Sequence, residues 1–128
     1  MVKFNRFVLD NGLRGIVHED HTTPMAVLNI LYDVGARDES PDQTGFAHLF
    51  EHLMFGGSVN IPQYDEPLQR VGGENNAFTT NDITNYYITL PAENIETAFW
   101  LESDRMLSLA FSEKSLEVQR KVVCEEFK

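Results

Sequence analysis

The chain has 128 residues, with 20 acidic and 10 basic side chains and a formal net charge of −10. This length suits one modest core, and an acidic balance without a Lys/Arg-rich run argues against nucleic acid or a membrane surface as the partner. The single Cys124 excludes an internal disulfide. No signal-peptide or membrane-spanning pattern is found, so we expect a cytoplasmic location.

The first part of the chain predicts β-structure. Residues 4–9 and 13–19 flank Asn11-Gly12, a pair that favours hairpin turns with positive φ. Residues 25–34 (MAVLNILYDV) form a longer apolar run that suits a central strand. A polar, turn-rich stretch follows, and Thr44 at its end is the expected N-cap of the next helix.

That next helix, ended by Gly56-Gly57, carries the most informative motif of the chain. At 100° per residue, His48, Glu51 and His52 lie on one side. Apolar residues fill the remaining arc, so we expect the helix to be largely buried: Phe46, Leu49, Phe50, Leu53 and Met54.

Burial of two imidazoles and a carboxylate without partners costs several kcal/mol, so this polar stripe should line a cleft or bind a cation. Zinc accepts imidazole nitrogen and carboxylate oxygen, and Glu51 is placed to act as the general base for a metal-activated water. The spacing alone leaves open a hydrogen-bonded pair of surface histidines.

The remaining segments predict a mixture of helices and strands. Residues 62–71 favour a short helix stopped by Gly72-Gly73, and residues 76–90 favour two strands or one bent strand. Residues 91–109 and 113–127 then predict two helices.

The last helix offers two adjacent candidates for a third metal ligand. Glu125 shares a charged face with Glu117, Lys121 and Lys128, which is typical of a solvated position. Glu126 lies instead in an apolar arc, where a carboxylate favours a cation. The alternative is that the helix frays at its end and leaves Glu126 in water.

Three motifs in this order resemble one family. They are His48-x-x-Glu51-His52 after Thr44-Gly45-Phe46-Ala47, the segment containing Gly72-Gly73, Asn76-Ala77, Thr79, Asp82, Thr84 and Tyr86, and the stretch from Arg120 to Glu126. Together they resemble the inverzincin zinc metallopeptidases of the pitrilysin/insulysin and mitochondrial processing peptidase family. The likeness covers nearly the whole chain.

The resemblance implies specific roles. His48, His52 and Glu126 would bind Zn²⁺, and Glu51 would be the catalytic base. Asn76 and Ala77 would bind an extended substrate peptide by strand addition, although without the family they indicate an ordinary edge strand. Some relatives carry a second Glu seven residues before the distal ligand, where this chain has Gln119. Gln119 cannot carry a proton or a negative charge, which predicts weaker activity or dependence on another group.

The resemblance also implies an α+β fold, with an antiparallel-rich sheet and helices packed on one face. Residues 1–128 would form the N-terminal portion of a single, apparently truncated, zinc metallopeptidase domain. We expect a zinc-dependent endopeptidase acting on peptides or unfolded polypeptides, together with a related second domain or subunit, or as a homodimer. The alternative functions are a non-catalytic peptide-binding or assembly subunit of the same family, and metal binding for structure alone.

Overall fold

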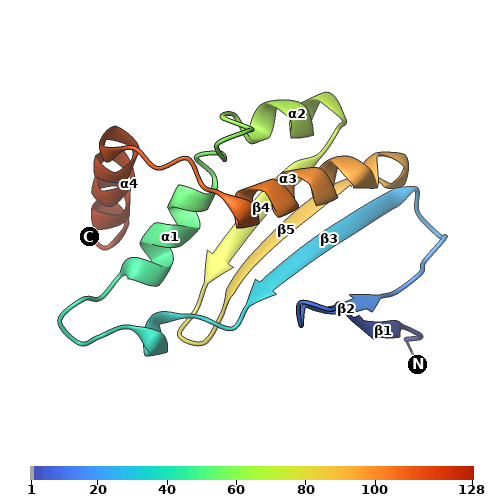
Figure 1. Cartoon of the computed structure of the whole chain (residues 1–128), viewed down its shortest axis with the longest axis horizontal. Helices are drawn as coiled ribbons and strands as arrows, with labels where there is room; N and C mark the ends of the chain where they lie inside the picture. Colours follow the sequence, from blue (N-terminus) through green and yellow to red (C-terminus); the bar gives the residue numbers. More distant parts are fainter. Residues whose placement is uncertain (1) are drawn as a thin grey trace.

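The computed structural model describes residues 2–128 and has an α+β architecture (Figure 1). The main sheet contains β3 (Met25–Tyr32), β4 (Glu74–Thr79) and β5 (Thr84–Pro91), all antiparallel, in the order β3-β5-β4. Strands β1 (Asn5–Val8) and β2 (Arg14–Val17) pair as a separate hairpin. The predicted antiparallel-rich sheet is therefore confirmed, and the 76–90 segment forms two strands.

Helices cover one face of the main sheet (Figure 1). They are α1 (Phe46–Met54), α2 (Asp65–Arg70) and α3 (Ile95–Leu107), and α4 (Glu113–Glu126) lies beside α1. Short 3-10 turns occupy Ala36–Asp38 and Ala92–Asn94. No helix within residues 2–128 has the combined length and apolar character needed to cross a membrane.

The core lies between β5 and the helices α2 and α3. Alternate β5 residues, Tyr86, Ile88 and Leu90, are buried because the two-residue repeat of a strand points them all toward the helices. The apolar cluster also includes residues of α2, of α3 and of the loop before α2: Ile61, Tyr64, Leu68, Ala98 and Leu101. Several apolar residues on the other face of the sheet, such as Val27 and Leu31, remain exposed.

The start of α1 differs from the prediction. The N-cap residue is Gly45, not Thr44, and its φ of 89° lies in the left-handed region that favours glycine. The Glu39 carboxylate accepts hydrogen bonds from the backbone amides of Gly45 and Ala47, each at 2.7 Å. A carboxylate from the preceding loop thus supplies the cap that Thr44 was expected to supply.

The predicted burial of α1 is also wrong in part. Leu53 and Met54 are buried, but Phe46 and Phe50 are about half exposed. The reason is that the sheet covers only part of the helix, and these two rings point into an open cavity. The other helices are shorter than predicted, and the capping box of Ser112 with Ser115 sets the start of α4.

Candidate metal centre

Three side chains from two segments far apart in the sequence converge between α1 and α4. His48 and His52 stand one turn apart on α1, and Glu126 is the last residue of α4. Glu126 Oε2 lies 3.2 Å from His48 Nε2 and 3.4 Å from His52 Nε2, and the two Nε2 atoms are 3.1 Å apart. These three atoms therefore form a nearly equilateral triangle, and the residues are those whose convergence the sequence predicted.

This triangle has the dimensions of a zinc site. Zinc bonds to nitrogen and oxygen of about 2.0–2.2 Å in tetrahedral geometry separate two ligand atoms by roughly 3.3–3.6 Å. The observed edges of 3.1–3.4 Å need only a few tenths of an ångström of expansion to meet that range. Two imidazoles and a carboxylate are also a common donor set of catalytic zinc sites. The residues present thus fit Zn²⁺.

Gln119 contacts one of these histidines. Its Oε1 lies 3.3 Å from His52 Nδ1. Gln119 lies about two turns before Glu126, on the same side of α4. An amide oxygen only accepts, so a hydrogen bond here requires the proton on Nδ1; in a neutral imidazole this leaves the lone pair of Nε2 for a metal. The neighbouring Glu125 pairs instead with Lys128 at 2.6 Å and is exposed, as its charged helix face predicted.

Glu51 lies in a cleft beside the metal triangle. The cleft has a volume of about 800 Å³, and its lining includes His48, Glu51, Ala77, Thr79 and Phe127. The Thr79 hydroxyl donates a hydrogen bond to Glu51 Oε2. A carboxylate next to two imidazoles, facing an open cleft, is suited to accept a proton from a bound water.

The two residues predicted to bind substrate separate in the structure. Ala77 lines the cleft, whereas Asn76 is exposed on the opposite face of β4. The Asn76 side chain accepts a hydrogen bond from the Ala77 amide at 2.8 Å. Within residues 2–128, β4 is an edge strand of the main sheet, so one row of its backbone groups has no neighbouring strand.

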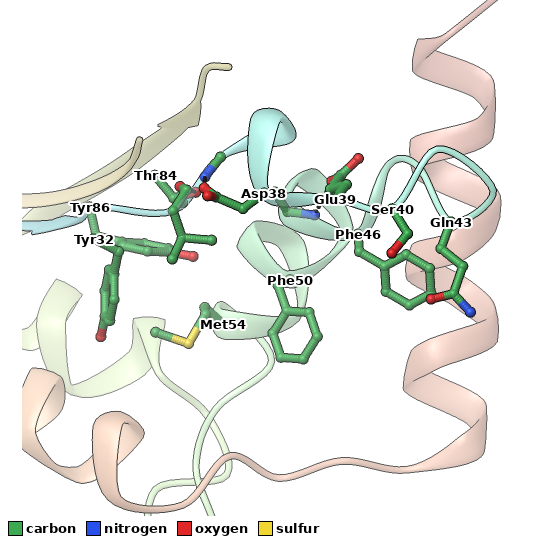
Figure 2. A pocket seen from close by; sticks show the side chains of 13 residues that line it. Tyr32, Asp38, Glu39, Ser40, Gln43, Phe46, Phe50, Met54, Thr84 and Tyr86 are labelled. Carbon is green, nitrogen blue, oxygen red and sulfur yellow. Dashed lines mark hydrogen bonds between the residues drawn. The ribbon is translucent and has the colours of Figure 1, made fainter. Parts of the chain in front are cut away.

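A second cavity lies on the other side of α1 (Figure 2). It measures about 430 Å³, and Tyr32, Phe46, Phe50 and Met54 give it an apolar lining. Glu39 lies at its rim, but this carboxylate is occupied by the backbone amides at the start of α1. This cavity therefore offers no second metal site.

The C-terminal end of α1 rests on a buried charged residue. Arg105 of α3 forms a bidentate ion pair with Glu102, and its guanidinium carbon lies 4.6 Å from the ring centres of both Tyr64 and Tyr86. Arg105 Nη1 also lies 3.5 Å from the carbonyl oxygen of Met54. Burial raises the pKa of the Tyr86 phenol; Arg105 opposes this effect, and the charge of Glu51 adds to it.

Sequence reasoning missed two contacts at this site. Glu39 caps α1, and Thr79 binds Glu51 across the gap between strand and helix. Thr79 belongs to the segment that carries the resemblance, but no periodicity links a strand residue to a helix residue 28 positions away. Glu39 shows a usable signal, since an acidic residue shortly before a helix is a common source of capping oxygens.

Comparisons with known proteins match this chain to a family of peptidases. The profile of the family "Insulinase (Peptidase family M16)" matches residues 14–128. The chain is 35% identical to the zinc protease PqqE of Helicobacter pylori over 127 residues, which cover 97% of this chain and 29% of that protein. It is also 30% identical to cytochrome b-c1 complex subunit 1 of Bos taurus over 120 residues, covering 92% of this chain and 25% of the subunit.

A solved structure of a protease from Helicobacter pylori superposes on 98% of this chain with a TM-score of 0.91 and 34% identity, and the match covers 31% of that protease. The chain thus spans about a third or less of the length of these relatives. The family profile and the superposed structure each cover nearly all of the described residues. The chain belongs to the insulinase family of peptidases, peptidase family M16.

Proposed function

We propose that this chain carries the catalytic metal centre of a zinc-dependent endopeptidase. The observation that carries the proposal is the triangle of His48, His52 and Glu126, whose edges of 3.1–3.4 Å suit a tetrahedral zinc ion. A relative named as a zinc protease supports the same metal and the same class of reaction.

In this proposal, the two histidines and Glu126 hold Zn²⁺, and Gln119 fixes the tautomer of His52. When bound, zinc polarises the scissile carbonyl and makes a coordinated water more acidic. Glu51 accepts the proton from the attacking water and passes it to the leaving amine. Within residues 2–128, Cys124 is exposed on α4 and has no histidine partner, so a covalent cysteine mechanism receives no support.

The substrate is proposed to be an extended peptide that lies along the edge of β4. A peptide pairing there would pass Ala77 and reach the cleft in which Glu51 lies. Recognition would then depend mainly on the peptide backbone. The Ala77 amide would exchange its bond with Asn76 for a bond with the substrate.

The proposal extends to partners because the chain covers under a third of its relatives. A related second domain or subunit would close over the cleft and determine which peptides enter. The similarity to a cytochrome b-c1 subunit keeps the alternative of an assembly role in view. The chain retains His48, Glu51, His52 and Glu126, and this complete set favours catalysis.

The test compares Glu51→Gln with the wild type and with Glu125→Gln, an exposed glutamate outside the cleft. Each protein is loaded with one equivalent of zinc and incubated with unstructured peptides. We expect Glu51→Gln to keep zinc and lose about 10²–10⁴-fold of the cleavage rate, because the general base is removed. Glu125→Gln should behave as the wild type.

Each alternative predicts a different result. If zinc binds but wild type and Glu51→Gln are equally inactive when the related second domain or subunit is also present, the metal is structural and the proposed function is wrong. Equal activity of the two proteins would contradict the assignment of Glu51 as the base.

A further inference from the structure

We propose that Thr79 is a positioning residue for Glu51, so that the edge strand β4 sets the orientation of the catalytic base. The inference rests on the proposed function, in which Glu51 accepts a proton. The observation is a partly buried hydrogen bond from the Thr79 hydroxyl to Glu51 Oε2, which joins β4 to α1.

The location of Thr79 makes this hydroxyl a fixed donor. Thr79 pairs with Thr84 of β5 at the end of β4, so the sheet holds its backbone on one side. Threonine is branched at Cβ and restricted at χ1, which reduces the entropy lost when its hydroxyl is held in one direction. A charged acceptor also makes the bond stronger than a neutral pair.

The hydrogen bond occupies only one of the two carboxylate oxygens. Glu51 Oε2 accepts from Thr79, and Oε1 accepts no hydrogen bond from residues 2–128. Fixing one oxygen sets the torsion of the carboxylate and leaves the other oxygen available for the proton. A base held in this way needs no reorientation during the reaction, and a misplacement of about 1 Å can cost on the order of a hundredfold in rate.

The same strand connects the base to the substrate edge. Ala77 stands two residues before Thr79, and both side chains project toward α1 from β4. A peptide that pairs with β4 would therefore stiffen the element that holds Glu51. If the hydrogen bond from Thr79 to Glu51 only stabilised the packing of β4 against α1, its removal would not change the orientation of the Glu51 carboxylate.

The experiment compares Thr79→Val, which removes the hydroxyl at constant shape, with Thr79→Ser, which keeps it. Thr89→Val is the matched control, since Thr89 lies in the same sheet and its hydroxyl makes no hydrogen bond within residues 2–128. With zinc loaded, Thr79→Val should lose about 10–100-fold in kcat with KM within twofold of the wild type. Thr79→Ser should stay within about threefold of the wild type, and zinc content should be unchanged throughout.

A second readout does not depend on activity. In crystal structures of the zinc-loaded proteins, Glu51 should occupy one rotamer in the wild type and in Thr79→Ser, and several in Thr79→Val. If Thr79→Val does not fold, Thr79→Ala removes the same hydroxyl and replaces it in both measurements.

The two readouts separate the failures. One unchanged Glu51 rotamer in Thr79→Val overturns the inference, whether or not the protein cleaves peptides. A wild type that cleaves no peptide counts against the proposed function, and the rotamer comparison still decides the role of Thr79.

Discussion

Two clusters of ionisable side chains lie at α1, and their carboxylates are paired in different ways. In the Arg105 cluster (Tyr64, Tyr86, Glu102 and Arg105), the ion-paired side chains are only 2% and 4% exposed. In the metal cluster (His48, His52 and Glu126), the side chains are 28%, 20% and 47% exposed.

The difference lies in the partners of the two carboxylates, Glu102 and Glu126. Glu102 accepts two hydrogen bonds from Arg105 and one from the Tyr64 hydroxyl, so its charge is neutralised inside the protein. Within residues 2–128, Glu126 faces only two imidazoles and no Lys or Arg. The Arg105 cluster neutralises its charge inside the fold, whereas the metal cluster leaves a carboxylate that suits a cation from outside, as the proposed function requires.

The largest expected effect comes from removing the arginine of the Arg105 cluster. Arg105→Met should lower the free energy of unfolding by about 3–5 kcal/mol, because Glu102 would remain buried without its partner. Urea unfolding measures this loss. Arg105→Met combined with Glu102→Gln should recover much of it, and a loss below about 1 kcal/mol would show that the Arg105 cluster is not needed for stability.

The next effect tests whether zinc binding by the metal cluster depends on all three of its side chains. Glu126→Gln should weaken zinc binding by on the order of a hundredfold or more, since a four-ligand site provides roughly 3 kcal/mol per ligand. Competition against a chromophoric chelator measures the affinity. Glu125→Gln is the control, and equal weakening by both variants would remove Glu126 from the site.

A smaller effect tests the role of Gln119, which contacts the proposed ligand His52. Gln119→Ala should weaken zinc binding roughly tenfold, because His52 would lose the acceptor that fixes its tautomer. The same competition assay applies, and the unfolding free energy of the metal-free protein should hardly change. Unaltered zinc affinity would show that the contact between Gln119 and His52 does not influence metal binding.

A last effect, confined to high pH, concerns the tyrosines of the Arg105 cluster. Burial raises the pKa of Tyr64 and of Tyr86 above the usual value near 10. Above pH 10 the unfolded chain therefore loses protons that the folded chain keeps, so stability falls as the pH rises. Tyr86→Phe should reduce this slope by about 1.4 kcal/mol per pH unit, measured by urea unfolding between pH 10 and 12. An unchanged slope would mean that Tyr86 ionises in the folded protein.

The metal cluster could be predicted from the sequence, whereas the Arg105 cluster could not. The helical spacing of His48, Glu51 and His52 and the apolar arc around Glu126 pointed to the metal cluster, because ligands on regular helices follow a fixed period. Nothing in the three-residue spacing of Glu102 and Arg105 on α3 distinguishes them from the exposed ion pairs that are common on helices. Only the packing of α3 against β5 makes them a buried pair.

The start of α1 shows the same limit. Thr44 has the residue type of an N-cap, but the choice of Glu39 depends on how the loop from 35 to 44 folds back. The exposure of Phe50 likewise depends on which side of α1 the sheet covers. Local patterns predict the elements and their polar faces, whereas contacts between distant segments follow from the assembled fold.

The wide separation of the metal ligands along the chain has a consequence for synthesis. His52 on α1 and its contact Gln119 on α4 are 67 residues apart, and α2, β4, β5 and α3 all lie between the two helices that carry the metal cluster. At roughly 5–20 residues per second, a ribosome completes the histidine helix several seconds before it completes α4. In the proposed function, the nascent chain therefore holds a base without a full metal site. Docking of α4 against α1, and not synthesis of the histidine helix, would then complete the proposed site.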